Sequence, residues 1–104
     1  RHCMAKGSES IYSALLESVK NIKSRIACSA KLKITRISKN SCLIEEKTWL
    51  QSPSFILIIT ILPDNCGTWH IYCTAANNSL LSLAKEELIK LSLAYNAKIE
   101  TGLC

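Results

Sequence analysis

The two histidines are the side chains best suited to acid/base chemistry in this 104-residue chain. Polar and apolar residues alternate along residues 68–73, so we expect His70 on a strand, on the face opposite Trp69 and Ile71. Beside His2 or Lys33, His70 could act as a general acid or base, as in a small extracellular hydrolase of ribonuclease type. No motif fixes such a geometry, so we favour a structural or solvent-facing histidine and keep the hydrolase as an alternative.

The sequence offers no other signature of catalysis. Its three glycines are isolated from one another, so no glycine-rich loop could hold a phosphate. The adjacent carboxylates at 45–46 and 86–87 would point in different directions in a strand or a helix, so we expect them to face solvent and not to work as pairs. We therefore expect a protein that is not an enzyme and that needs no cofactor.

Six cysteines are a high and even number for a chain of this length. They favour three disulfides and a secreted protein whose leader has been removed. We expect Cys3 to pair with Cys104. No C-x-x-C spacing is present, so we expect no metal site. Asn77 begins an Asn-Asn-Ser sequon and is a potential N-glycosylation site. The six cysteines are Cys3, Cys28, Cys42, Cys66, Cys73 and Cys104.

Positive charge is concentrated in one part of the chain, which carries a formal net charge of +5. Between Glu17 and Glu45 there are basic residues and no acidic ones. Such a patch attracts an acidic protein, an anionic lipid surface or a nucleic acid. Nucleic acid is not favoured, because no aromatic residues that could stack on bases are interleaved there. The predicted patch consists of Lys20, Lys23, Arg25, Lys31, Lys33, Arg36 and Lys39.

Hydrophobic spacing predicts the elements that would position these groups. Residues 55–62 are almost wholly apolar, and turn residues separate them from residues 68–73, which predicts a central β-hairpin. Apolar residues recur every three or four positions within residues 9–27 and again from Leu80 to Tyr95, which predicts two amphipathic helices. Weaker patterns predict strands at 31–37, 42–50 and 98–104, and an edge strand at 1–6 that would pair antiparallel with the last one.

Residues 1–104 are therefore expected to form a single α+β domain. We predict a disulfide-stabilised two-layer sandwich in which two helices cover one face of an antiparallel sheet of four to six strands. Its element order resembles the ferredoxin-like arrangement with an extra hairpin. No apolar run is long enough to span a membrane.

Apolar residues point to both faces of the predicted strand at 55–62, yet two helices can cover only one face of the sheet. The other face calls for a partner, either a second copy of the chain or a host or receptor protein. We therefore expect a small secreted cysteine-rich protein of the effector, toxin or immune-ligand kind, which binds a target protein or an anionic surface. A lipid or membrane-surface binder is a further alternative.

Overall fold

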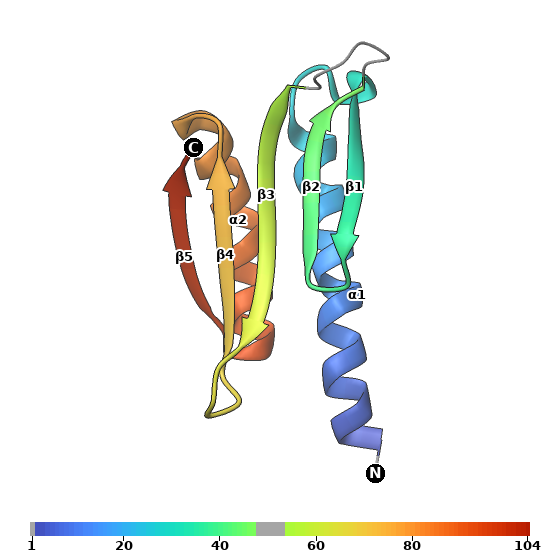
Figure 1. Ribbon diagram of the computed structural model, residues 1–104, viewed down its shortest axis with the longest axis vertical. Helices are drawn as coiled ribbons and strands as arrows, with labels where there is room; N and C mark the ends of the chain where they lie inside the picture. Colours follow the sequence, from blue (N-terminus) through green and yellow to red (C-terminus); the bar gives the residue numbers. More distant parts are fainter. Residues whose placement is uncertain (1, 48–53) are drawn as a thin grey trace.

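A computed structural model describes residues 2–47 and 54–104, with the backbone alone for residues 2–10. It contains two helices and five strands, joined mostly by short turns (Figure 1). A single 3-10 turn, Ser29–Lys31, follows the first helix. In chain order the elements are α1 (His2–Arg25), β1 (Leu32–Ser38), β2 (Ser41–Glu46), β3 (Phe55–Pro63), β4 (Trp69–Ala75), α2 (Asn78–Tyr95) and β5 (Lys98–Leu103).

The five strands form one sheet in the order β1-β2-β3-β4-β5. The first four make an antiparallel meander, whereas β5 runs parallel to β4. A parallel neighbour needs a crossover connection, and α2 supplies it. Both helices lie behind the sheet in Figure 1, so the predicted α+β fold with two helices on one face is confirmed.

The core lies between the helices and the inner face of the sheet. The predicted apolar stripe of α1 is fully buried at Ile11, Leu15, Val19 and Ile22. On the central strand, Leu57, Ile59 and Ile61 point toward the helices and are also fully buried. Cβ atoms alternate across a strand, so the residues between these three lie on the outer face.

Three predictions about the ends and directions of the elements are wrong. Residues 2–10 belong to α1, which begins at His2 instead of near Glu9, so there is no N-terminal strand within them. The ferredoxin-like element order is therefore wrong, because its first strand is missing. The sheet is mixed instead of antiparallel, because β5 pairs parallel with β4. Gly7 and Ser8 resemble a helix boundary in the sequence, but helix propensity is a weak prior that the rest of the fold overrides. The strand predicted at 42–50 ends at Glu46, and positions 48–50 lie outside the described residues.

The predicted disulfide stabilisation is not found. No bond joins any two of the five cysteines whose side chains are described, namely Cys28, Cys42, Cys66, Cys73 and Cys104. Cys42 and Cys73 both pair with Ile59, one from each side, so two strand spacings of ~4.8 Å separate them, more than the ~7 Å a disulfide can span. The start of α1, which carries Cys3, and the end of β5, which precedes Cys104, lie at opposite ends of the molecule (Figure 1), so the pairing of Cys3 with Cys104 is wrong.

Candidate functional site

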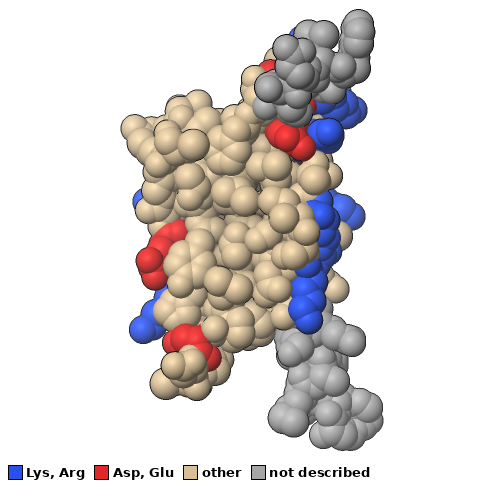
Figure 2. All heavy atoms as spheres, in the orientation of Figure 1, with Lys and Arg blue, Asp and Glu red and all other residues tan. Residues whose placement is uncertain are grey.

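The outer face of the sheet is the most extended candidate site. Among the described residues no helix covers it, and we call it the open face. Figure 2 shows this face, where residues other than Lys, Arg, Asp and Glu fill the centre and charge is confined to the margins. Its centre consists of Leu43, Ile58, Thr60, Tyr72 and Thr74.

Strand register places these central residues side by side. Leu43 pairs with Ile58, which pairs with Thr74, in one row across β2, β3 and β4. In the adjoining row the Ser41 and Thr60 hydroxyls are hydrogen-bonded at 2.7 Å. Side chains of a row support one another, so Leu43, Ile58 and Thr60 are half-buried without any second layer. The result is an aliphatic and hydroxyl-bearing surface that is largely preformed.

His70 lies on the margin of the open face, held between two carboxylates. Its Nε2 donates a 2.9 Å hydrogen bond to Oδ2 of Asp64, while its Nδ1 is buried without a hydrogen bond. Oε2 of Glu100 lies 3.8 Å from Nδ1, too far for a hydrogen bond. The ring stacks on Tyr72 with centroids 6.1 Å apart.

Asp64 is anchored by the turn between β3 and β4. Its Oδ1 accepts hydrogen bonds from the amides of Cys66 at 2.8 Å and Thr68 at 2.9 Å. The bond from His70, and then those from the backbone amides, hold the pKa of Asp64 below its ordinary value. Gly67 completes the turn with a φ of 83°, a conformation that suits glycine. Sequence reading assigned Asp64 to the turn but missed its contact with His70.

The predicted acid/base couple of His70 and Lys33 is not assembled. Lys33 lies on β1 opposite Glu45, whereas His70 lies on β4 opposite Leu62, with β2 and β3 between them (Figure 1). The His2 side chain lies outside the described part. One ring nitrogen of His70 is hydrogen-bonded to Asp64 and the other is buried. His70 therefore joins strand and turn in this arrangement.

Most of the predicted basic patch lies along α1 and β1. Figure 2 shows Lys and Arg side chains following the β1 side of the molecule. Within this group the Arg36 guanidinium donates to the backbone oxygens of Ser38 and Lys39. Nζ of Lys39 lies 5.4 Å from the centre of the Tyr12 ring. We call Lys20, Lys23, Lys31, Arg36 and Lys39 the basic edge.

Two predicted patch residues are instead neutralised by carboxylates. Arg25 turns toward α2 and contacts Glu86 at 2.6 Å and Glu87 at 3.1 Å, which raises the pKa of its guanidinium. Lys33 lies 3.8 Å from Glu45. Neither side chain adds a free positive charge to the basic edge.

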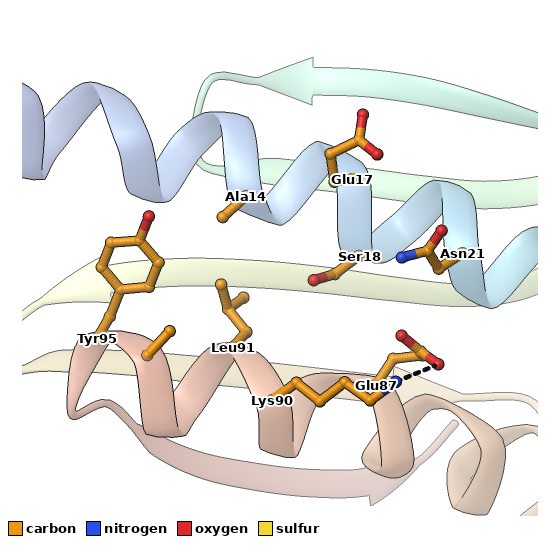
Figure 3. Close-up of a pocket in the computed structure, with 9 residues that line it drawn as sticks. Ala14, Glu17, Ser18, Asn21, Glu87, Lys90, Leu91 and Tyr95 are labelled. Atoms are coloured by element: carbon orange, nitrogen blue, oxygen red, sulfur yellow. Dashed lines mark hydrogen bonds and ion pairs between the residues drawn. The ribbon is translucent and has the colours of Figure 1, made fainter.

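A groove of about 370 Å³ runs between the two helices on the far side of the sheet (Figure 3). Small residues such as Ala14, Ser18 and Ala94 line it. Glu87 is nearly buried at its end, where its Oε2 accepts from Arg25 and, at 3.4 Å, from Nζ of Lys90. Sequence reading placed Glu87 in solvent, although it falls within the apolar arc of α2. These contacts link α1 to α2, so the burial of the Glu87 carboxylate is explained by its ion pairs with Arg25 and Lys90.

The remaining predicted sites are distributed over the molecule. Cys28, Cys66 and Cys104 are exposed at three separate places, and Cys42 and Cys73 are buried. Asn77 is exposed at the start of α2, where its side chain accepts a 2.9 Å hydrogen bond from the Leu80 amide. None of the described helices is both long enough and apolar enough to cross a membrane. Comparison of the chain with protein-family models, with curated proteins and with solved structures finds no match in any of the three.

Proposed function

We propose that the protein acts by binding another protein and that the open face is its contact surface. One observation carries this proposal: among the described residues helices cover one side of the sheet only, yet the centre of the other side is free of charged residues. A one-sided antiparallel sheet ordinarily carries polar residues on its solvent face. An extended uncharged surface with a charged rim is typical of protein interfaces, whose centres are depleted of charged residues.

The exposed parts of the open face match this role. Leu62 is 45% exposed and Tyr72 is 37% exposed. Tyrosine is enriched at interfaces because its ring buries apolar area while its hydroxyl can still form a hydrogen bond. The hydroxyl groups of Thr60 and Thr74 add further donors and acceptors. Such a surface binds by shape and by hydrogen bonds more than by net charge.

The proposal includes the class expected from the sequence, a secreted protein of the effector, toxin or immune-ligand kind. Its support is the number of cysteines in a short chain, and not a bridge, because the five described cysteines are unpaired. The basic edge supports a second contact, with an anionic surface.

Photochemical cross-linking tests the contact surface. A photoreactive phenylalanine analogue replaces Tyr72 on the open face, and in a matched control it replaces Leu93, which is 79% exposed on α2. Irradiation of the full chain, purified and in extracts of its native source, should give adducts from position 72 whose cross-linked peptides identify a partner. Equal yields from both positions, or no adduct from position 72, would contradict the proposal.

A further inference from the structure

The outer edge of β1 is suited to a contact of its own. We infer that this edge binds an extended acidic segment of another protein, which adds to the sheet as a further strand beside β1. This inference rests on the second contact of the proposed function, since it names the partner of the basic edge. It concerns a different surface from the open face.

The strand register leaves backbone groups of β1 pointing away from the sheet. Among the described residues, β2 is the only strand that pairs with β1. In an antiparallel pair, every second residue exchanges hydrogen bonds with the neighbouring strand, and the residues between them point outward. The Lys47 amide donates to the backbone oxygen of Lys31, so the odd-numbered residues of β1 face β2. The amide and carbonyl groups of Ile34 and Arg36 therefore face outward.

These outward groups are able to pair with another strand. The described residues supply no hydrogen bond to the amides of Ile34 and Arg36. The Leu32 amide differs, since it donates to the oxygen of Ser29 in the preceding turn. A row of unpaired amides and carbonyls along an edge is a template on which an extended peptide can add.

Cations lie on the helix side of this edge. Arg36 pairs with Cys42, whose side chain is buried on the inner face, so the Arg36 side chain is on that face too. On α1, which lies behind the sheet in Figure 1, Tyr12 faces the turn after β1, where it contacts Lys39. Lys23 follows Tyr12 by eleven residues, about three helical turns, and so lies on the same side of α1. Every second side chain of an added strand would point toward these cations, and carboxylates there would complement them.

The outer side of the same edge calls for no charge from the partner. Lys33 points to the outer face, where its Nζ lies 3.8 Å from Oε2 of Glu45. The same carboxylate oxygen accepts a 2.8 Å hydrogen bond from the Thr35 hydroxyl. The other side chains of the added strand would lie beside Thr35, where β-branched residues pack well. The partner segment therefore alternates acidic and β-branched residues.

The same cations oppose the pairing of β1 with its own copy. β1 contains Lys33 and Arg36 and no carboxylate. Two β1 strands paired edge to edge would gather the cations of both copies along one joint, and like charges across an interface are costly. Lysine on an edge strand is a common means by which natural proteins avoid such pairing. Charge thus favours an acidic strand over a second copy.

Hydrogen exchange of the full chain, followed by NMR of its backbone amides, tests the inference. The probe is a synthetic seven-residue peptide in which glutamate and valine alternate, with both ends blocked. At millimolar concentration it should slow the exchange of the Ile34 and Arg36 amides at least ~10-fold, because they become hydrogen-bonded. The amides of β5, at the opposite edge of the sheet, should exchange at an unchanged rate.

A second peptide separates strand addition from attraction by charge alone. It has the same composition, but its glutamates are placed together and its valines together. It should bind at least ~10-fold more weakly, because its carboxylates would lie on both sides of an added strand.

Two variants test the cations beside the edge. Lys23→Gln should weaken binding of the alternating peptide roughly 2–5-fold, as expected for one exposed charge pair. Arg25→Gln, the matched control, should leave it unchanged, because Glu86 and Glu87 already balance this charge. Circular dichroism and thermal melting establish that each variant is folded.

Equal binding of the two peptides would overturn strand addition, as would unchanged exchange of the Ile34 and Arg36 amides. In either case heparin binding that weakens with added salt would leave the anionic contact of the basic edge in place. An adduct from position 72 would likewise leave the open face as a contact surface.

Discussion

Cys42, Ile59 and Cys73 form one row across three strands on the inner face of the sheet. Desolvation raises the pKa of both thiols, to about 11 for Cys73, and for Cys42 the nearby positive charge of Arg36 opposes the shift. Because the thiolate is the reactive form, these two cysteines behave as core side chains. Cys28, Cys66 and Cys104 are the exposed thiols among those described.

The raised pKa of Cys73 makes the folded protein less stable in alkali. In the unfolded chain the thiol ionises near its ordinary pKa of 9.0, whereas in the folded chain burial raises this pKa to about 11. The unfolded state therefore binds fewer protons between these two values, and the free energy of unfolding falls as pH rises. The loss is on the order of 2–3 kcal/mol, at about 1.4 kcal/mol per pKa unit.

Urea unfolding at pH 8, 9, 10 and 11 measures this loss. Lysines and tyrosines also titrate in that range, so Cys73→Ala serves as the matched control and should show a shallower fall. Parallel curves for the two proteins would contradict the burial of this thiol.

Single side chains also show where sequence reading fails. Glu87 was assigned to solvent because it is charged and adjacent to Glu86, but its partner Arg25 comes from the other helix and only the fold brings the two together. The contact between Asp64 and His70 similarly depends on how the turn folds back on β4. By contrast, Ile11, Leu15 and Val19 could be assigned to the core, because their spacing alone defines a helix face.

At the scale of elements, the first turn of α2 depends on Asn77. Its side chain accepts from the Leu80 amide, one of the amides that a helix start leaves without a backbone partner. The αL residue Asn96 ends the same helix, with its amide bonded to Ser92 O. The helix predicted from Leu80 to Tyr95 therefore begins two residues earlier, at Asn78.

Removing the cap separates its structural role from glycosylation. Asn77→Ala should lower the free energy of unfolding by about 0.5–2 kcal/mol, whereas Asn77→Asp retains a capping oxygen and should change it little. Ser79→Ala destroys the sequon but leaves the cap in place. Urea unfolding of the four proteins made without a glycan, and the intact mass of each made in a glycosylating host, give the two readouts. Equal stability of Asn77→Ala and the unmodified chain would rule out the cap.

Strand positions could be predicted, but the direction of β5 was not. Alternation of side chains identifies a strand and is the same whether it runs parallel or antiparallel to its neighbour. The direction of β5 is set by the connection that precedes it. The 18-residue helix α2 returns the chain to the end of the sheet where β4 began, so β5 must run parallel to β4. The open face could be anticipated, because residues 55–62 carry more apolar residues than two helices could cover.

On the scale of the whole molecule, the net charge of +5 is unevenly placed. The basic edge follows α1 and β1, whereas Arg25 and Lys33 are each held by carboxylates. Long-range attraction of an anion therefore comes from the basic edge and not from the whole set of residues that the sequence indicated.

Binding to heparin over a series of salt concentrations measures this attraction. Affinity should fall with added salt, and Lys31→Gln with Lys39→Gln should reduce the salt slope by about 2, roughly one per lysine. Arg25→Gln should leave the slope unchanged, because Glu86 and Glu87 already balance its charge. Fluorescence anisotropy with labelled heparin gives the slopes. A salt slope that changes with Arg25→Gln and not with the two lysine substitutions would contradict the assignment of this attraction to the basic edge.

The position of α2 and β5 at the end of the chain has a consequence during synthesis on the ribosome. When the meander from β1 to β4 has emerged, α2 has not yet been synthesised. The side chains of Ile71, Cys73 and Ala75, which are buried in the folded protein, are then still uncovered. A nascent chain paused near residue 77 therefore exposes the apolar inner side of β4, which becomes buried only when α2 has been made and packs on it.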